Sequence, residues 1–112
     1  MIDLLSEPVL EVEHGRSALV LWVCQPFDDN YSFRDLFARL TSVLEKKRPL
    51  TWTLPAEERG EDYVQGSMRW GESAFDVYYE RSLGYVQFTA VANSDPSELL
   101  VTVRNDLSWT GQ

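Results

Sequence analysis

Residues 63–92, YVQGSMRWGESAFDVYYERSLGYVQFTAVA, decide the fold of this chain. Apolar and polar residues alternate through three runs, and short turn sequences containing Gly71 and Gly84 separate them. Alternation with a period of two is typical of strands with one buried face. Glycine-containing turns of this length join such strands into a meander. The segment therefore predicts three consecutive antiparallel strands, over residues 63–70, 74–81 and 85–92.

The alternation divides the side chains of these strands into two sets, because successive side chains of a strand point to opposite faces. The apolar set is expected beneath helices and comprises Val64, Gly66, Met68, Trp70, Phe75, Val77, Tyr79, Val86, Phe88, Ala90 and Ala92. The polar set is rich in tyrosine and comprises Tyr63, Gln65, Ser67, Arg69, Asp76, Tyr78, Glu80, Tyr85, Gln87 and Thr89. We expect this second set on a face of the sheet that meets solvent.

Two strands are predicted near the N-terminus. Residues 9–14 alternate, which places Leu10 and Val12 on one face. A turn at His14 and Gly15 then leads into residues 17–24, which are apolar on both faces. A strand of that kind belongs near the centre of a sheet, covered on both sides. A loop is predicted to follow, over residues 25–30.

A helix is predicted over residues 33–47. Its apolar residues recur at helical spacing and form one stripe: Phe33, Leu36, Phe37, Leu40, Val43 and Leu44. Ser32 is expected to cap the first turn, which also contains Asp35. The basic residues 46–48 are expected to stabilise the negative end of the helix dipole, and Pro49 ends the helix.

The remaining segments complete the fold. Residues 50–54 predict a short strand, and residues 56–62 an exposed acidic loop. Residues 94–107 begin like a helix, with Asp95, Pro96 and Glu98 at its start, but also contain a β-prone stretch, so that both helix and strand stay open. The order β-β-α-β-β-β-β-α predicts a single α+β domain over residues 1–112, with a mostly antiparallel sheet and helices packed on one face. The order of the strands within the sheet is left open.

Charge and hydropathy narrow the classes of function. The 112 residues include 18 acidic and 10 basic side chains, which gives a net charge of −8. Such a chain repels nucleic acid and anionic membranes and associates faster with basic proteins. Its longest apolar run, residues 18–24, is too short to span a membrane, and its N-terminus does not resemble a signal peptide. We therefore expect a cytoplasmic protein with no nucleic-acid or membrane partner.

The sequence contains no recognisable catalytic or metal-binding motif. His14, the single histidine, lies in a predicted turn. Cys24, the single cysteine, lies in the most apolar strand, where burial should raise its pKa and lower its reactivity. Zinc-type Cys and His pairs and a glycine-rich phosphate loop are absent from the sequence. We predict no catalytic residues, no cofactor and no metal, although carboxylates brought together by folding could still form an active site.

Exposed tyrosines beside acids favour a surface that binds a protein. Rigid aromatic residues carry much of the binding energy of protein interfaces, and neighbouring acids attract basic partners. The same tyrosines would also stabilise a bare sheet through cross-strand pairs. On the polar face, the predicted partner-binding residues are Tyr63, Asp76, Tyr78, Glu80, Tyr85 and Gln87. In the acidic loop, they are Glu57, Glu58, Glu61 and Asp62.

These features support three hypotheses about function. The first is a non-catalytic module that neutralises a basic partner, as a bacterial immunity protein or antitoxin does with a nuclease toxin, whose surface is basic because it binds phosphates. The second is a small acidic secretion chaperone or assembly subunit, which forms a homodimer through a sheet or helix face. The third is a ligand-binding domain or enzyme, which predicts a pocket between helix 33–47 and the sheet.

Overall fold

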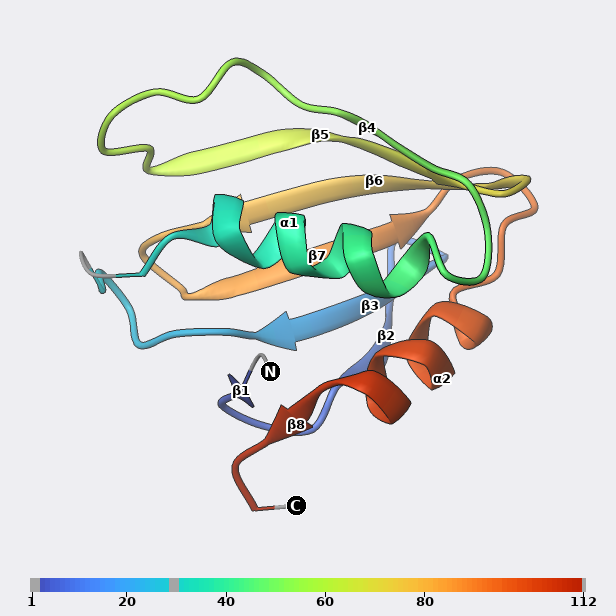
Figure 1. The fold of residues 1–112 in the computed structure, drawn as a ribbon, viewed down its shortest axis with the longest axis horizontal. Coiled ribbons are helices and arrows are strands. Elements are labelled where there is room, and N and C mark those ends of the chain that lie inside the picture. Colours follow the sequence, from blue (N-terminus) through green and yellow to red (C-terminus); the bar gives the residue numbers. More distant parts are fainter. Residues whose placement is uncertain (1–2, 29–30, 112) are drawn as a thin grey trace.

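The computed structural model of the protein describes residues 3–28 and 31–111 (Figure 1). Six strands form one antiparallel sheet in the order β2-β3-β7-β6-β5-β4. They are β2 (Val9–Glu13), β3 (Arg16–Trp22), β4 (Leu50–Thr53), β5 (Tyr63–Trp70), β6 (Ser73–Glu80) and β7 (Tyr85–Ala90). The other elements are the helices α1 (Phe33–Leu44) and α2 (Ser97–Asp106), and a short parallel pair, β1 (Asp3–Leu4) and β8 (Ser108–Trp109). The predicted α+β fold with a mostly antiparallel sheet is confirmed.

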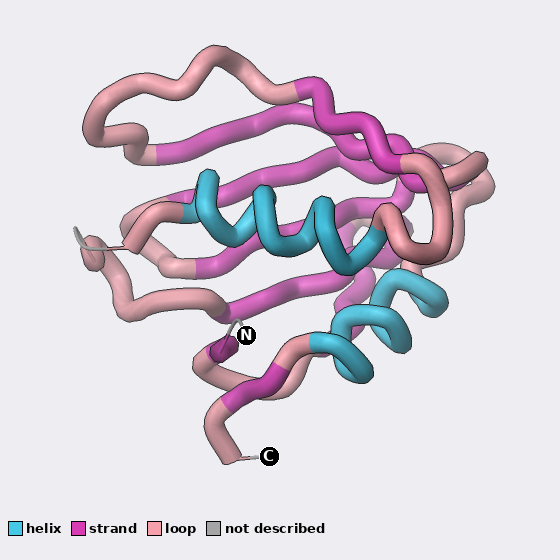
Figure 2. Tube along the Cα trace, in the orientation of Figure 1, coloured by secondary structure: helices cyan, strands magenta, loops and turns pink. Residues whose placement is uncertain are grey.

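Both helices lie on the same side of the sheet (Figures 1 and 2). The apolar stripe of α1 packs on the meander: Phe33 stacks on Tyr79 with ring centroids 4.3 Å apart, and Phe37 lies 6.5 Å from Phe88. Phe37 also stacks on Trp52 of β4, at 4.6 Å. In the described part of the chain, neither helix is long and apolar enough to cross a membrane.

The N-termini of the two helices are capped differently. Asp95 accepts a hydrogen bond from the backbone N–H of Ser97 at 2.9 Å, so it supports the start of α2 although Pro96 is the N-cap residue. Of the two alternatives left open for residues 94–107, the structure shows the helix, over residues 97–106. Ser32 is the N-cap residue of α1, but its side chain makes no capping hydrogen bond, which corrects the prediction.

The end of α1 also differs from the prediction. The helix ends at Leu44, before the basic residues 46–48. Lys47 donates instead to the hydroxyl of Thr102, at 3.1 Å, and Arg48 forms an ion pair with Glu98. These basic side chains connect α1 to α2, because the chain after α1 turns toward the second helix.

The strand predicted to be central lies second from the edge. β3 is placed between β2 and β7, whereas β7 and β6 occupy the middle of the sheet. Its residues 18–21 are nevertheless all fully or almost fully buried. A strand buried on both faces has an apolar sequence wherever it lies in the sheet, so hydrophobicity alone did not give the strand order.

The edge strand β2 follows the predicted alternation, and the end of β7 corrects one further expectation. Leu10 and Val12 alternate along β2 as predicted and are 40% and 76% exposed on this edge strand. Ala92, expected on the buried face, lies beyond the end of β7 and is exposed. The predicted tight turn between β2 and β3 is present, with positive φ at both His14 (51°) and Gly15 (76°). Of the loop predicted over residues 25–30, residues 29–30 lie outside the described residues.

Candidate protein-binding surface

The sheet face opposite the helices carries four aromatic side chains on four adjacent strands. Cross-strand pairing aligns residues in the order Trp22, Tyr85, Glu80 and Tyr63. Tyr78 lies two residues before Glu80 on β6, and its ring bridges the neighbours: its centroid is 6.4 Å from that of Tyr85 and 6.4 Å from that of Tyr63. The centroids of Trp22 and Tyr85 are 5.2 Å apart. We call Trp22, Tyr85, Tyr78 and Tyr63 the aromatic row.

The aromatic row is accessible, and two exposed leucines lie in chain segments next to it. Trp22 is 38% exposed and Tyr63 is 60% exposed, while the two central tyrosines are half-buried. The row lies beside the turn between β6 and β7, on which Leu83 is exposed. Leu5, also exposed, donates its backbone N–H to the carbonyl of Trp22 at 2.9 Å. Exposed apolar residues rimmed by polar ones are typical of interaction surfaces.

The carboxylate of Glu80 lies within the row and is held by two hydroxyl groups. Tyr78 donates to Oε1 at 2.8 Å, and Ser82 donates to Oε2 at 2.9 Å. The hydrogen bond to Glu80, together with burial and the charge of the carboxylate, raises the pKa of Tyr78 to about 12. In the described part of the chain, no cationic side chain forms an ion pair with Glu80. Its charge is therefore fixed in position but not neutralised.

Asp76, the other predicted acid of this face, is paired with Arg16. The Nη2 atom of Arg16 lies 2.9 Å from Oδ2 of Asp76, and its Nε donates to the carbonyl of Ala90 at 2.9 Å. Gln87, the remaining predicted residue of the face, is aligned with Tyr78 on the next strand. All six residues predicted on the polar face thus lie on one surface, but only one of its two predicted acids keeps an uncompensated charge.

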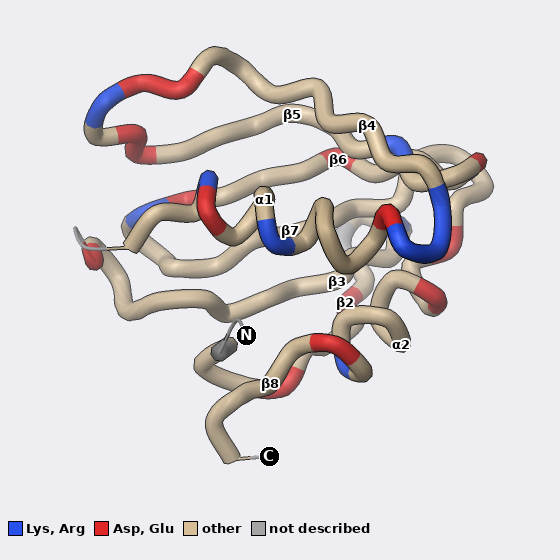
Figure 3. Tube along the Cα trace, viewed as in Figure 1, with Lys and Arg blue, Asp and Glu red and all other residues tan. Residues whose placement is uncertain are grey.

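The acidic loop between β4 and β5 is held mainly against α1. Arg34 of α1 binds Glu61 with two hydrogen bonds, of 3.1 and 2.7 Å, and donates to the carbonyl of Pro55 at 3.0 Å. This contact lowers the pKa of Glu61, whose side chain is only 11% exposed. Asp62 pairs with Arg81 at 2.9 Å. Figure 3 shows the resulting close succession of acidic and basic segments along this loop and at the start of α1.

Two exposed acids of the loop have no close arginine partner, whereas Asp62 is 77% exposed but paired with Arg81. Glu57 is 67% exposed and lies 4.0 Å from Arg34, a weak contact. Glu58 is exposed as well. The structure therefore does not unite the ten predicted residues in one negative patch, because internal arginines neutralise Asp76, Glu61 and Asp62.

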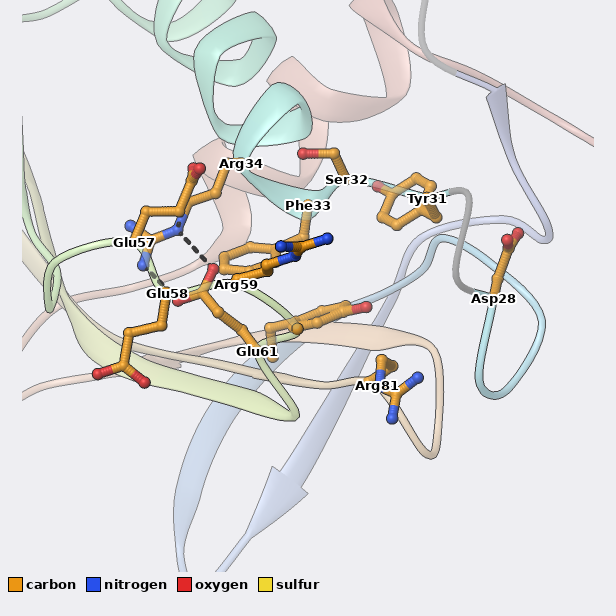
Figure 4. Close-up of a pocket in the computed structure, with 12 residues that line it drawn as sticks. Asp28, Tyr31, Ser32, Phe33, Arg34, Glu57, Glu58, Arg59, Glu61 and Arg81 are labelled. Atoms are coloured by element: carbon orange, nitrogen blue, oxygen red, sulfur yellow. Dashed lines mark hydrogen bonds and ion pairs between the residues drawn. The ribbon is translucent and has the colours of Figure 1, made fainter.

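A pocket of about 270 Å³ opens at the N-terminal end of α1 (Figure 4). Its aromatic lining comes from Tyr31, Phe33 and Tyr79, and charged groups of both signs surround it. The hydroxyl oxygen of Tyr31 is buried and finds no hydrogen-bond partner among the described residues, and burial raises its pKa far above the ordinary value. The ion pair between Arg34 and Glu61 forms part of the wall. A pocket between this helix and the sheet was the expectation of the ligand-binding hypothesis.

Cys24 and His14, the two side chains considered for chemistry, lie beyond opposite ends of β3. Cys24 is buried, and burial raises the pKa of its thiol, as predicted, while a hydrogen bond with Tyr79 acts in the opposite direction. His14 is exposed in its turn. Across residues 3–28 and 31–111, no three His, Cys, Asp or Glu side chains are grouped so as to hold a metal ion.

The sequence did not reveal Trp22, Ser82 or the arginines that pair with the acids. Trp22 belongs to a run that is apolar on both faces, so only its pairing with Tyr85 reveals its place in the row. Ser82 occupies a turn, and nothing local distinguishes it from other turn serines. The arginines that neutralise the acids are distant in sequence: Arg16 is 60 residues from Asp76. No short motif could have shown such a pairing.

Comparison of the chain with protein families, with curated proteins and with solved structures gave no match.

Proposed function

We propose that this protein is a non-catalytic binding module that uses the helix-free face of its sheet to bind and neutralise a basic protein. The aromatic row is the observation that carries the proposal: four rings on adjacent strands, with the carboxylate of Glu80 among them. Tyrosine and tryptophan are enriched at the energetic centres of protein interfaces. Because strands hold the rings in place, little side-chain freedom is lost when a partner binds.

Charge supports a basic partner. The net charge of −8 accelerates encounters with a positively charged protein over a range of roughly one Debye length, about 8 Å at physiological salt. Within the row, Glu80 has no ion pair among the described residues. The loop adds two exposed acids, Glu58 and Glu57, the second only weakly paired with Arg34 at 4.0 Å. Fewer acids are available to a basic partner than the sequence suggested. The charge that would attract the partner comes from one carboxylate within the row and from the acidic loop.

The class of partner that this description fits best is a toxin that acts on nucleic acid. The active surface of such a toxin must be basic in order to bind phosphates. A small acidic domain that covers this surface with aromatic side chains and carboxylates would inhibit the toxin without chemistry of its own. A bacterial immunity protein or antitoxin is therefore the proposed role.

Capture of a partner from the native host, followed by an inhibition assay, tests the proposal. The wild-type protein and the variant Val101→Ala, which alters an exposed residue of α2 far from the row, should retain the same basic protein. The double variant Trp22→Ala Tyr63→Ala should lose it, and high salt should weaken the complex. Coexpression with the wild type, but not with the double variant, should suppress the toxicity of the partner. Equal capture by the double variant, or a partner that is not basic, contradicts the proposal.

Sedimentation of the same double variant tests the assembly-subunit alternative. A homodimer through the helix-free face would bury the aromatic row against a second copy of the chain. Sedimentation would then show a dimer for the wild type and a monomer for Trp22→Ala Tyr63→Ala. A monomeric wild-type protein removes this alternative.

The pocket at the N-terminus of α1 favours ligand binding as a second candidate function. It has an aromatic lining, and the hydroxyl of Tyr31 there finds no hydrogen-bond partner among residues 3–28 and 31–111. Thermal stability measured with a panel of small polar compounds tests this candidate. A compound that raises the melting temperature of the wild type, but not of Tyr31→Phe, would support it.

A further inference from the structure

We infer that the centre of the aromatic row is a receptor for a guanidinium group, and that the basic partner anchors an arginine side chain there. This inference rests on the proposed function and names the chemical group that the surface recognises. It follows from three features: how Glu80 is held, which rings surround it, and how the chain uses its own arginines.

The carboxylate of Glu80 has unused capacity to accept hydrogen bonds. Each of its oxygens accepts one bond, from the hydroxyl of Tyr78 or of Ser82. A carboxylate offers about four lone-pair sites in all, so each oxygen can accept one more bond. Two parallel N–H groups of a guanidinium match two such oxygens, whereas an ammonium donates from a single point. The geometry therefore favours arginine over lysine.

Aromatic rings surround this carboxylate. Tyr63 and Tyr85 are its cross-strand neighbours on either side, and Tyr78 lies next to both rings at 6.4 Å. A guanidinium is attracted to the face of a ring when it lies within about 6 Å of the centroid. A guanidinium bound to Glu80 would therefore lie close to at least one tyrosine ring.

Among the residues that the structure describes, the chain forms the same arrangement internally at three places. Each of three arginines pairs with a carboxylate and also lies over an aromatic ring. Arg34 pairs with Glu61 and lies 5.1 Å from the centroid of Phe33. Arg48 pairs with Glu98 and lies 5.1 Å from Trp70. Arg81 pairs with Asp62 and lies 5.3 Å from Phe27.

Glu80 and its tyrosines have the acid and the rings of this arrangement but lack the arginine. Asp76, the other predicted acid of the face, already has Arg16 as its partner. In the described part of the chain, Glu80 is hydrogen-bonded only by neutral hydroxyl groups. We therefore expect the protein that binds this face to supply the cation, as an arginine side chain.

Titration with a capped single residue tests this inference without the partner. N-acetyl-arginine amide, the lysine analogue and the neutral citrulline analogue are added in turn to the 15N-labelled protein. Amide and indole shifts are followed for the residues of the row. We expect saturable binding of the arginine compound in the millimolar range, centred on Glu80, Ser82 and Tyr85. The lysine compound should bind several-fold more weakly, and the citrulline compound should not bind.

Two variants locate the site. Glu80→Gln keeps hydrogen-bonding atoms for Tyr78 and Ser82 but removes the charge, and it should weaken arginine binding about fivefold or more. Glu72→Gln, in the exposed turn between β5 and β6, should leave it unchanged. Tyr63→Ala, which does not touch the hydrogen bonds of Glu80, should weaken it about twofold or more. The dispersion of each spectrum shows whether the variant is folded.

The outcomes distinguish this inference from the proposed function. Equal shifts with the arginine and citrulline compounds, shifts centred elsewhere, or unchanged binding by Glu80→Gln would overturn the arginine receptor. If, in addition, partner capture still requires Trp22 and Tyr63, the binding face stands and only the arginine anchor fails. If the arginine compound binds as expected but the double variant captures the partner normally, the receptor stands and the proposed function fails.

Discussion

Arg16, at the start of β3, reaches across β7 and places its Nη2 atom 2.9 Å from Oδ2 of Asp76 on β6. Its Nε is bound on the way to the carbonyl of Ala90 on β7. The pair neutralises an acid that the sequence predicted to be available to a partner. Glu80, four residues further along β6, has hydroxyl groups in place of a cation. Two acids on one strand therefore have different electrostatic roles.

Loss of Glu80 and loss of the Arg16–Asp76 ion pair should affect association with a basic partner unequally. Glu80→Gln removes an uncompensated charge, so we expect the association rate to fall about threefold or more at low salt. The double variant Arg16→Gln Asp76→Asn removes both members of a balanced pair and keeps the net charge, so the rate should change less than about twofold. Arg16→Gln alone exposes the charge of Asp76 and should raise the rate. Stopped-flow measurements at two salt concentrations check this, and equal effects of Glu80→Gln and the double variant would contradict it.

Removal of the Glu61 charge should destabilise the protein. Arg34 binds this carboxylate with two hydrogen bonds in a site where the Glu61 side chain is only 11% exposed. Glu61→Gln should therefore lower the free energy of unfolding by about 1–3 kcal/mol. The matched control is Glu57→Gln, which changes an exposed acid 4.0 Å from the same arginine and should cost less than about 0.5 kcal/mol. Urea unfolding measures both, and similar costs would show that the Arg34 pair does not fasten the loop.

The hydroxyl of Tyr78 should ionise only at strongly alkaline pH. Its pKa is about 12 in the folded protein, against an ordinary value of 10, because it donates a hydrogen bond to Glu80. The folded state thus keeps a proton that the unfolded state loses first. The stability that this bond provides is fully present below pH 10 and is lost as the pH rises through 12.

Absorbance of the phenolate reports this ionisation. Tyr78→Phe should remove the absorbance change of one tyrosine from the high-pH end of the wild-type titration curve. Glu80→Gln, which removes the charge but not the tyrosine, should shift that tyrosine to lower pH. A curve unchanged by Glu80→Gln would mean that the carboxylate does not hold the hydroxyl proton.

Gly84 in the turn between β6 and β7 should not tolerate a side chain. Its φ is +72°, and a Cβ atom would lie 2.1 Å from the carbonyl oxygen of Cys24. Gly84→Ala should therefore cost more than about 3 kcal/mol. Gly60 has a similar φ of +69° but nothing within 4 Å of such an atom, so Gly60→Ala should cost only about 1 kcal/mol. Thermal unfolding compares the two, and equal losses would show that backbone strain alone matters at Gly84.

The spacing of apolar residues along the sequence determined which side chains of the strands and of α1 are buried. Alternation in residues 63–92 separated the buried set from the exposed tyrosines, because a pleated strand turns successive side chains to opposite faces. Helical spacing identified α1 and the stripe that packs on the sheet. The apolar residues that precede Cys24 in the sequence predicted that its side chain is buried, as it is. Each of these properties depends on residues that are neighbours along the chain.

Only the tertiary structure decided which distant residues meet. The position of β3, second from the edge, brings Trp22 beside Tyr85 and completes the aromatic row. Three acids that looked available in the sequence are paired with arginines on other elements, as Glu61 is with Arg34. Strand order and long-range ion pairs depend on how separate elements pack in three dimensions, and a periodic sequence pattern carries no information about that packing. The sequence therefore determined the two faces of the sheet, and the folded structure decided that Glu80 lies on one of them without a cationic partner among the described residues.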